Sequence, residues 1–160
     1  MPKTLFSLMM LFSLAHAQSA LTKETTLFEY ADESHCTIKN GEHETLAVVP
    51  LLVAEHSAEG AQSELIIKAL EESLKNRQCD IHAPDAIGLN ALQVAILFND
   101  VTMVRYLLEN GADPKRFIEH EQNPLNGKNS FEFFLEILKT KENDDKVNRD
   151  EIERILQEYR

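Results

Sequence analysis

The sequence predicts an all-α fold, built as a short stack of helix-turn-helix units. Apolar residues recur at helical spacing in pairs of short segments, and several of these segments begin with a side chain that can cap a helix. The arrangement also recurs along the chain, which is typical of a repeat protein. The pattern is clearest between residues 85 and 117, which predict one complete unit.

The central unit opens with a tight turn and a short helix. Asp85 and Gly88 suit the first and last positions of a four-residue turn. Asn90 can cap the free amides of the helix that follows, and Gln93 can return the interaction in a capping box. The buried face expected for this helix comprises Leu92, Ala95 and Ile96.

A second helix is expected directly afterwards, antiparallel to the first. Asp100 can cap its start, and Gly111 supplies the left-handed residue that ends it. Its apolar stripe comprises Met103, Val104, Leu107 and Leu108. Together the two helices form a helical hairpin with a loop on either side.

These motifs resemble those of an ankyrin repeat, whose period is ~33 residues. Residues 88–92 (G-L-N-A-L) stand where the family usually has G-x-T-P-L, and Gln93 stands in the place of its histidine. Leu107-Leu108 and Gly111-Ala112-Asp113 follow the family pattern. The resemblance implies a short ankyrin-repeat solenoid of about three helix-turn-helix repeats, with degenerate capping repeats at its ends.

A third repeat is expected downstream of the central one. Residues 127–131 copy the spacing of residues 88–92, and Asn129 with Glu132 forms a second potential capping box. Residues 152–156 have the apolar pattern of the second central helix. We therefore assign this repeat to residues 124–160.

A first repeat is expected upstream, because an isolated unit would leave its apolar faces in water. Residues 50–54 resemble an inner helix, and residues 67–70 begin the stripe of an outer one. Residues 79–83 then occupy the place of the family's A-D-x-N-A loop. The predicted boundaries of the ankyrin-repeat domain (44–160) place this repeat at 44–84 and the central one at 85–123.

The N-terminus has the pattern of a secretory signal peptide. Lys3 is followed by an apolar run over residues 5–14, and Ala15-His16-Ala17 is a small-residue cleavage site. We expect a signal peptide at residues 1–17, cleaved near Ala17/Gln18, and a periplasmic or secreted protein with no membrane insertion afterwards. The alternative is a buried or membrane-anchoring helix, although the run is too short to span a bilayer.

Residues 18–43 lack repeat character and are interpreted as an N-terminal capping arm. Leu27, Phe28 and Tyr30 are expected to pack as a short helix against the first repeat. The polar face of such an arm would give the stack the hydrophilic end that a solenoid requires.

The mature chain contains only two cysteines, Cys36 and Cys79. An even number in an oxidising compartment favours one disulfide, which would join the arm to the loop before the central repeat. The alternative is a pair of free buried thiols. Neither cysteine belongs to a C-x-x-C motif, so thiol catalysis is not expected.

The chain is strongly acidic, with a formal net charge of −11. Nucleic acid is a poor partner for such a chain because phosphate binding requires a basic stripe. Anionic membrane surfaces are disfavoured for the same reason. A basic protein partner would be attracted, although acidic surfaces also serve solubility alone.

Motifs that carry chemistry are missing from the sequence. It contains no G-x-S-x-G elbow, no H-E-x-x-H and no glycine loop for phosphate or dinucleotides. The histidines are scattered without the close spacing that metal ligands need. We therefore expect no enzymatic activity, no metal and no cofactor.

Apolar residues occupy positions that ankyrin-repeat proteins usually expose for binding, at the turn tips and at the outward edge of each inner helix. The candidates for protein binding are Ala86, Ile87, Leu89, Leu97 and Phe98, and, at the matching tip of the third repeat, Leu125 and Asn126. Exposed apolar patches usually mark an interface. Alternatively, loops at residues 57–62 or 142–148 cover them, or Phe98 fills a gap between repeats.

Three functional classes are compatible with this sequence. The first is a binding protein that masks a partner, such as a toxic effector neutralised in the periplasm by an immunity protein. The second is an accessory factor for a periplasmic enzyme in stress defence, of the kind that supports catalase. The third is a secreted, host-directed ankyrin effector. Self-association through Ile87 and Leu89 is also possible.

Overall fold

The computed structural model describes residues 29–41, 44–58, 60–140 and 146–160. The expected signal peptide at 1–17 lies outside these residues, as do Leu27 and Phe28 of the arm. None of the described helices is long and apolar enough to cross a membrane.

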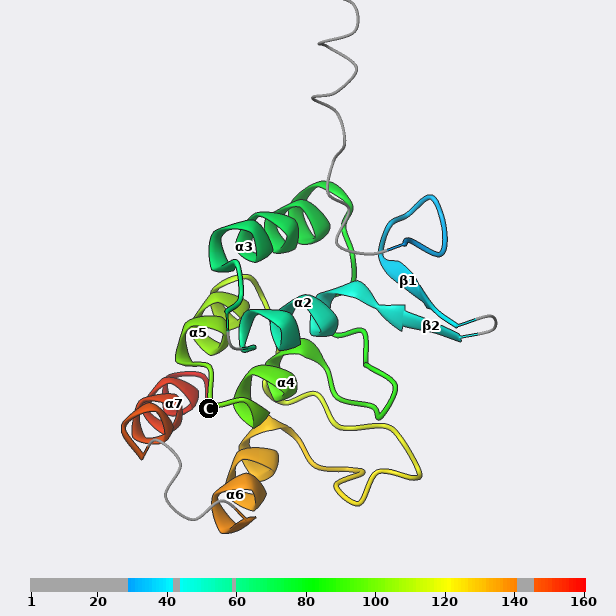
Figure 1. Cartoon of the computed structure of the whole chain (residues 1–160). Coiled ribbons are helices and arrows are strands. Elements are labelled where there is room, and N and C mark those ends of the chain that lie inside the picture. Colours follow the sequence, from blue (N-terminus) through cyan, green and yellow to red (C-terminus); the bar gives the residue numbers. More distant parts are fainter. Residues whose placement is uncertain (1–28, 42–43, 59, 141–145) are drawn as a thin grey trace, which may run out of the picture.

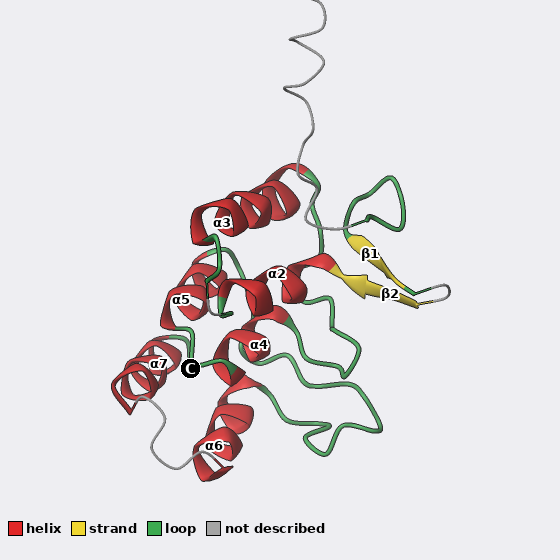
Figure 2. Cartoon of the chain, viewed as in Figure 1, coloured by secondary structure: helices red, strands yellow, loops and turns green. Residues whose placement is uncertain are grey.

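The described residues are mainly helical, with one two-stranded sheet (Figures 1 and 2). The strands are β1 (Thr37–Asn40) and β2 (Glu44–Ala47). The helices are α2 (Val48–His56), α3 (Ser63–Glu71) with a π-helical turn η1 (Glu72–Asn76), α4 (Ala91–Leu97), α5 (Val101–Glu109), α6 (Ser130–Thr140) and α7 (Lys146–Glu158).

The helices follow one another in pairs, α2 with α3, α4 with α5 and α6 with α7, and the pairs stack along one direction (Figure 1). Helices α2, α4 and α6 lie side by side in that order, and α5 packs against both α4 and α7 (Figure 1). The long loops that precede α4 and α6 extend to the same side as the β1–β2 hairpin (Figure 2). The loops and the helices α2, α4 and α6 therefore meet along one side of the stack.

The central hairpin has the caps that the sequence predicted. The capping box is complete, because the Asn90 side chain accepts a hydrogen bond from the Gln93 N–H and the Gln93 side chain accepts one from the Asn90 N–H. Asp100 accepts from the Met103 N–H at the start of α5. The predicted buried residues of both helices lie in the core: Leu92, Ala95, Ile96, Met103, Val104, Leu107 and Leu108.

The sheet was not predicted. Strands β1 and β2 pair antiparallel, from Thr37 opposite Ala47 to Asn40 opposite Glu44. The pairing crosses the expected boundary between the arm and the first repeat at residues 43 and 44. The all-α prediction therefore holds for the helical stack and is wrong for residues 37–40 and 44–47.

The expected helix around Tyr30 is also wrong where the structure describes it. Tyr30 forms an antiparallel bridge with Ile38, and the Lys39 N–H donates to the Glu29 carbonyl at 2.9 Å. The Tyr30 ring stacks on His35, with 4.4 Å between ring centroids, and the Arg77 guanidinium lies 5.1 Å from its centroid. The backbone is extended because its hydrogen-bonding groups pair with β1 rather than within a helix.

Cys36 and Cys79 form a disulfide with 5.3 Å between their Cα atoms. The bond attaches the residue before β1 to Cys79, which lies shortly after the π-helical end of α3 at Asn76. It closes a 43-residue separation and so ties the sheet to the first helical hairpin.

A polar cluster joins α2 to the start of α5. Both His56 Nδ1, at 2.7 Å, and Ser57 Oγ, at 2.9 Å, contact Asp100 Oδ2. The side chains of His56 and Asp100 are only 10% and 12% exposed. Because Asp100 also caps α5 through its other oxygen, one carboxylate orders a helix start and holds it against the neighbouring hairpin.

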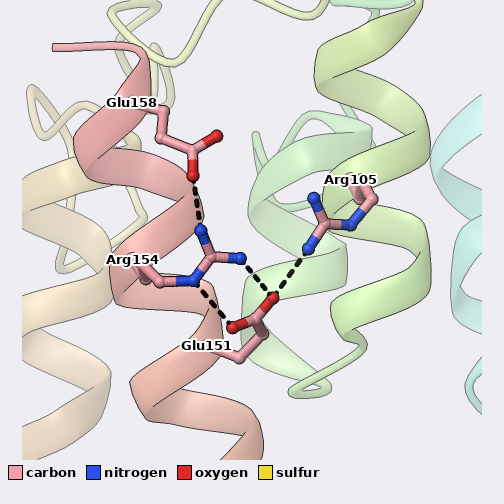
Figure 3. A network of polar contacts seen from close by, with 4 residues as sticks. All are labelled: Arg105, Glu151, Arg154 and Glu158. Carbon is pink, nitrogen blue, oxygen red and sulfur yellow. Dashed lines mark hydrogen bonds and ion pairs between the residues drawn. The ribbon is translucent and has the colours of Figure 1, made fainter.

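Helix α7 is attached to α5 by an exposed ionic network (Figure 3). Arg154 contacts both oxygens of Glu151, at 2.7 and 2.9 Å, and Glu158 at 2.6 Å. Arg105 of α5 donates to Glu151 at 2.6 Å. The hydrogen bond from Arg154 is the main reason that the pKa of Glu151 lies below its ordinary value.

Reduction of the disulfide is expected to destabilise the protein. The chain-entropy model assigns a cross-link of this length up to about 4 kcal/mol of the free energy of unfolding. Urea unfolding followed by circular dichroism should show a lower midpoint when reductant is added. A Cys36→Ser, Cys79→Ser variant is the control, because reductant should not change its midpoint. Equal wild-type midpoints with and without reductant would contradict the stabilising role.

Glu151→Gln is expected to lower the melting temperature in a pH-dependent way. A carboxyl whose pKa is lowered by folding stabilises the native state above its unfolded pKa, near 4.5. The stabilisation disappears as the pH falls through the lowered pKa of the folded state. The melting difference from wild type should therefore be present at pH 7 and shrink below about 4.5.

The matched control for this comparison is Asp150→Asn, which removes the same charge from the neighbouring exposed position of α7. Asp150 has no ion pair among the described residues. An equal melting shift in the two variants would assign the effect to the net charge of α7 instead of to the network.

Candidate functional site

A mostly apolar groove lies between α2, α4 and the turn that precedes α4. Its volume is about 370 Å³. The residues that line it are Leu46, Ala47, Pro50, Leu51, Ala54, Asp85, Ala86, Ile87, Leu89, Val94, Leu97 and Phe98. We call this feature the α2–α4 groove.

The two helical walls of the groove follow directly from helix periodicity. Pro50, Leu51 and Ala54 are spaced so that they lie on one side of α2, and Ala47, the N-cap residue of the helix, precedes them. Val94 and Leu97 lie on one side of α4 in the same way, and Phe98 follows at the C-terminal cap of the helix. Because α2 and α4 pack side by side, these two apolar stripes face a common space.

Five residues predicted for binding line this groove together: Ala86, Ile87, Leu89, Leu97 and Phe98. Ile87 is 54% exposed and Phe98 is 50% exposed, which is high for large apolar side chains. Phe98 therefore does not simply fill a gap between hairpins. Leu89 differs from the expectation of an exposed residue: it is only 3% exposed and forms part of the groove floor.

Leu125 and Asn126 do not line the groove. The Leu125 N–H donates to Asn123 Oδ1 at 2.8 Å, and the side chain packs against the core. Asn126 Oδ1 accepts from the His120 N–H at 2.9 Å. In this structure both residues shape the loop before α6 and add nothing to the apolar surface of the groove.

Sequence reasoning missed the residues of the groove that come from β2 and α2. Helix α2 (VVPLLVAEH) is apolar on nearly all sides, so its periodicity does not show which side faces the groove. The spacing of Pro50, Leu51 and Ala54 after Ala47 does match an apolar stripe on one side of a helix. That stripe becomes recognisable only when α4 is placed beside it.

Asp85 holds the turn that forms one end of the groove. Its Oδ1 accepts hydrogen bonds from the N–H groups of Ile87 and Leu89, each at 2.9 Å. Its own N–H donates to the Leu89 carbonyl at 2.8 Å, and its carbonyl accepts from Gly88 at 3.1 Å. These bonds fix Ile87 at the tip, with its side chain exposed.

Neighbouring loops support this turn. Asn123 Nδ2, from the next loop, donates to the Ile87 carbonyl at 2.7 Å. In the preceding segment, His82 Nε2 accepts from the Asp113 N–H at 2.9 Å. Successive loops are therefore hydrogen-bonded to one another, which makes the groove a preformed surface.

Ser57, His56 and Asp100 are the residue types of a catalytic triad and lie close together. Their hydrogen bonds, however, fit a structural role. Ser57 Oγ donates to Asp100 Oδ2, the same oxygen that His56 contacts, so the histidine is not placed to accept the serine proton. Across the described ranges, no group of three or more His, Cys, Asp or Glu side chains could hold a metal ion.

Comparisons with protein-family models, with curated proteins and with solved structures found no match to this chain. The groove and its surrounding residues are therefore the basis for the function proposed below.

The turn geometry predicts that Gly88→Ala destabilises the protein more than Gly111→Ala. Both glycines have positive φ, +87° and +95°, so each alanine carries the cost of a left-handed conformation, about 1–2 kcal/mol. A Cβ at Gly88 would also lie 2.4 Å from the Cβ of His120, whereas a Cβ at Gly111 meets no atom within 4 Å. Urea unfolding of the two variants measures the difference. Equal destabilisation would contradict close packing of the two loops.

Proposed function

We propose that this chain is a non-enzymatic protein-binding module of the ankyrin-repeat type that acts in the bacterial periplasm. Its role would be to mask a protein partner, such as a secreted toxic effector, in the manner of an immunity protein. The observation that carries this proposal is the α2–α4 groove. It unites five apolar residues at positions that ankyrin-repeat proteins use for binding, and two of them, Ile87 and Phe98, are about half exposed.

The groove is suited to a protein anchor. Binding energy at protein interfaces is concentrated in a few large apolar side chains that enter desolvated pockets. Transfer of exposed apolar surface such as that of Ile87 and Phe98 out of water contributes about 25 cal/mol per Å². The hydrogen bonds that hold Asp85, Asn123 and the turn tip limit the entropy lost on binding.

The proposed location is supported by the signal-peptide pattern of residues 1–17 and by the Cys36–Cys79 disulfide. Disulfides persist in the periplasm and outside the cell, whereas the cytosol keeps thiols reduced. A net charge of −11 would steer a basic partner toward the protein.

Two other functions share the location and the groove: an accessory factor for a periplasmic enzyme of stress defence, and a secreted host-directed effector. Affinity capture from the envelope extract of the source bacterium, with residues 18–160 as bait, separates these possibilities. A stoichiometric toxin that is inhibited on mixing supports the immunity role. Recovery of a resident enzyme such as catalase supports the accessory role.

The same capture experiment predicts the behaviour of a groove variant. Ile87→Ser with Phe98→Ser should keep the wild-type melting temperature, because both side chains are half exposed, yet lose the captured partner. Leu135→Ser is the matched control, since Leu135 on α6 is similarly exposed and does not line the groove. Capture that is unchanged by the groove variant, or lost equally with Leu135→Ser, would refute binding through the groove.

A further inference from the structure

Asp85 is the one charged residue among those that line the α2–α4 groove. Its two carboxylate oxygens are in different situations. Oδ1 accepts the N–H groups of Ile87 and Leu89, while Oδ2 has no hydrogen-bond partner among the described residues. No described cation forms an ion pair with it either. The groove thus presents an apolar surface with one unpaired carboxylate oxygen.

This situation differs from that of the other half-buried aspartate, Asp100. Both oxygens of Asp100 are occupied, Oδ1 by the Met103 N–H and Oδ2 by His56 and Ser57. Asp100 therefore has a complete structural role. Asp85 is held equally firmly by its Oδ1 contacts but keeps half of its hydrogen-bonding capacity available.

The unpaired oxygen restricts what can occupy the groove. A purely apolar occupant would cover Asp85 and remove water from its charge without replacement, and such desolvation is strongly unfavourable for an uncompensated ion. An occupant that brings a cation avoids this cost. The contact also becomes stronger as the apolar walls exclude water and lower the local dielectric.

The geometry also defines how the cation would bind. An arginine fork usually contacts both oxygens of a carboxylate. Here Oδ1 already accepts two backbone N–H groups, so its two lone pairs are in use. The contacts that remain are to Oδ2 alone, so the fork across both oxygens is not available, and lysine can bind there as well as arginine.

Resting on the binding function proposed above, we infer that the occupant is an amphipathic segment of a protein partner. It places a small number of large apolar side chains between α2 and α4, beside Ile87 and Phe98, and a neighbouring lysine or arginine on Asp85 Oδ2. The groove volume of about 370 Å³ limits the apolar part to a few side chains. The acidity of the whole chain acts in the same direction, because it attracts a basic segment.

Asp85→Asn tests the inference without removing the turn. The asparagine side-chain oxygen can accept the same two backbone N–H groups, so the melting temperature should change little. The substitution removes the charge that the inference requires. Glu109→Gln is the matched control, because it removes the same single negative charge at an exposed position at the end of α5, outside the groove.

The probe is a phage-displayed library of short random peptides, selected on the wild-type chain at physiological ionic strength. Selected peptides should combine apolar residues with a lysine or arginine at a constant spacing. Replacement of that cation by glutamine should weaken binding to the wild type and to Glu109→Gln by about tenfold. The same replacement should have little effect on binding to Asp85→Asn.

The outcomes separate the two proposals. If the cation contributes equally to binding of wild type and Asp85→Asn, or if Glu109→Gln abolishes its contribution, the specific contact with Asp85 is refuted while the groove stands. If the selected peptides bind the Ile87→Ser, Phe98→Ser variant as well as wild type, or if selection returns no binder, the groove function itself is refuted and this inference with it.

Discussion

Burial of α4 is the constraint on which the rest of the structure depends. Six of its seven residues, Ala91 to Ile96, are buried, and the helix lies between α2 and α6 with α5 against it. A helix of this length is unstable alone in water, since isolated helices shorter than about 12–15 residues are marginal. Its stability therefore comes from its capping box and from neighbours on several sides. Small side chains at Ala91 and Ala95 permit the close approach of those neighbours.

The ends of the stack are completed by different interactions. At the first hairpin, the sheet and the Cys36–Cys79 bond supply order that short helices alone do not provide. At the last hairpin, the ionic network around Glu151 joins α7 to α5 on an exposed surface (Figure 3). The first attachment is covalent and the second is electrostatic. The two ends are therefore expected to respond differently to reductant, salt and pH.

The α2–α4 groove is a consequence of this packing rather than an independent feature. Helix α4 uses one side for the core and leaves Leu97 and Phe98 at its end, where α2 contributes a second apolar stripe. Asp85 belongs both to the fold and to the groove. One of its oxygens holds the turn before α4, and the other has no partner among the described residues and lies at the groove. In the proposed binding role, recognition and folding share Asp85, and its charge serves the partner more than the fold.

Much of the central hairpin could be predicted from sequence because its determinants are local. Caps act within three residues of the helix start, and the buried stripes of α4 and α5 follow helical periodicity. The same reasoning identified Ile87 at the turn tip and Phe98 at the end of α4 as exposed apolar residues. It did not identify the β1–β2 pairing, the burial of Leu89 or the contribution of α2 to the groove.

The sequence by itself determined where the central helices begin and which of their faces are buried, because those properties depend on residues a few positions apart. Only the tertiary structure decided which side of the uniformly apolar α2 meets α4, and how β1 pairs with β2 and with Tyr30. It also decided the contacts of Asp100 with His56 and of Asn123 with the Ile87 carbonyl, which join residues 44 and 36 positions apart. Such contacts form only when packing brings distant segments together, and short-range spacing in the sequence carries no information about them.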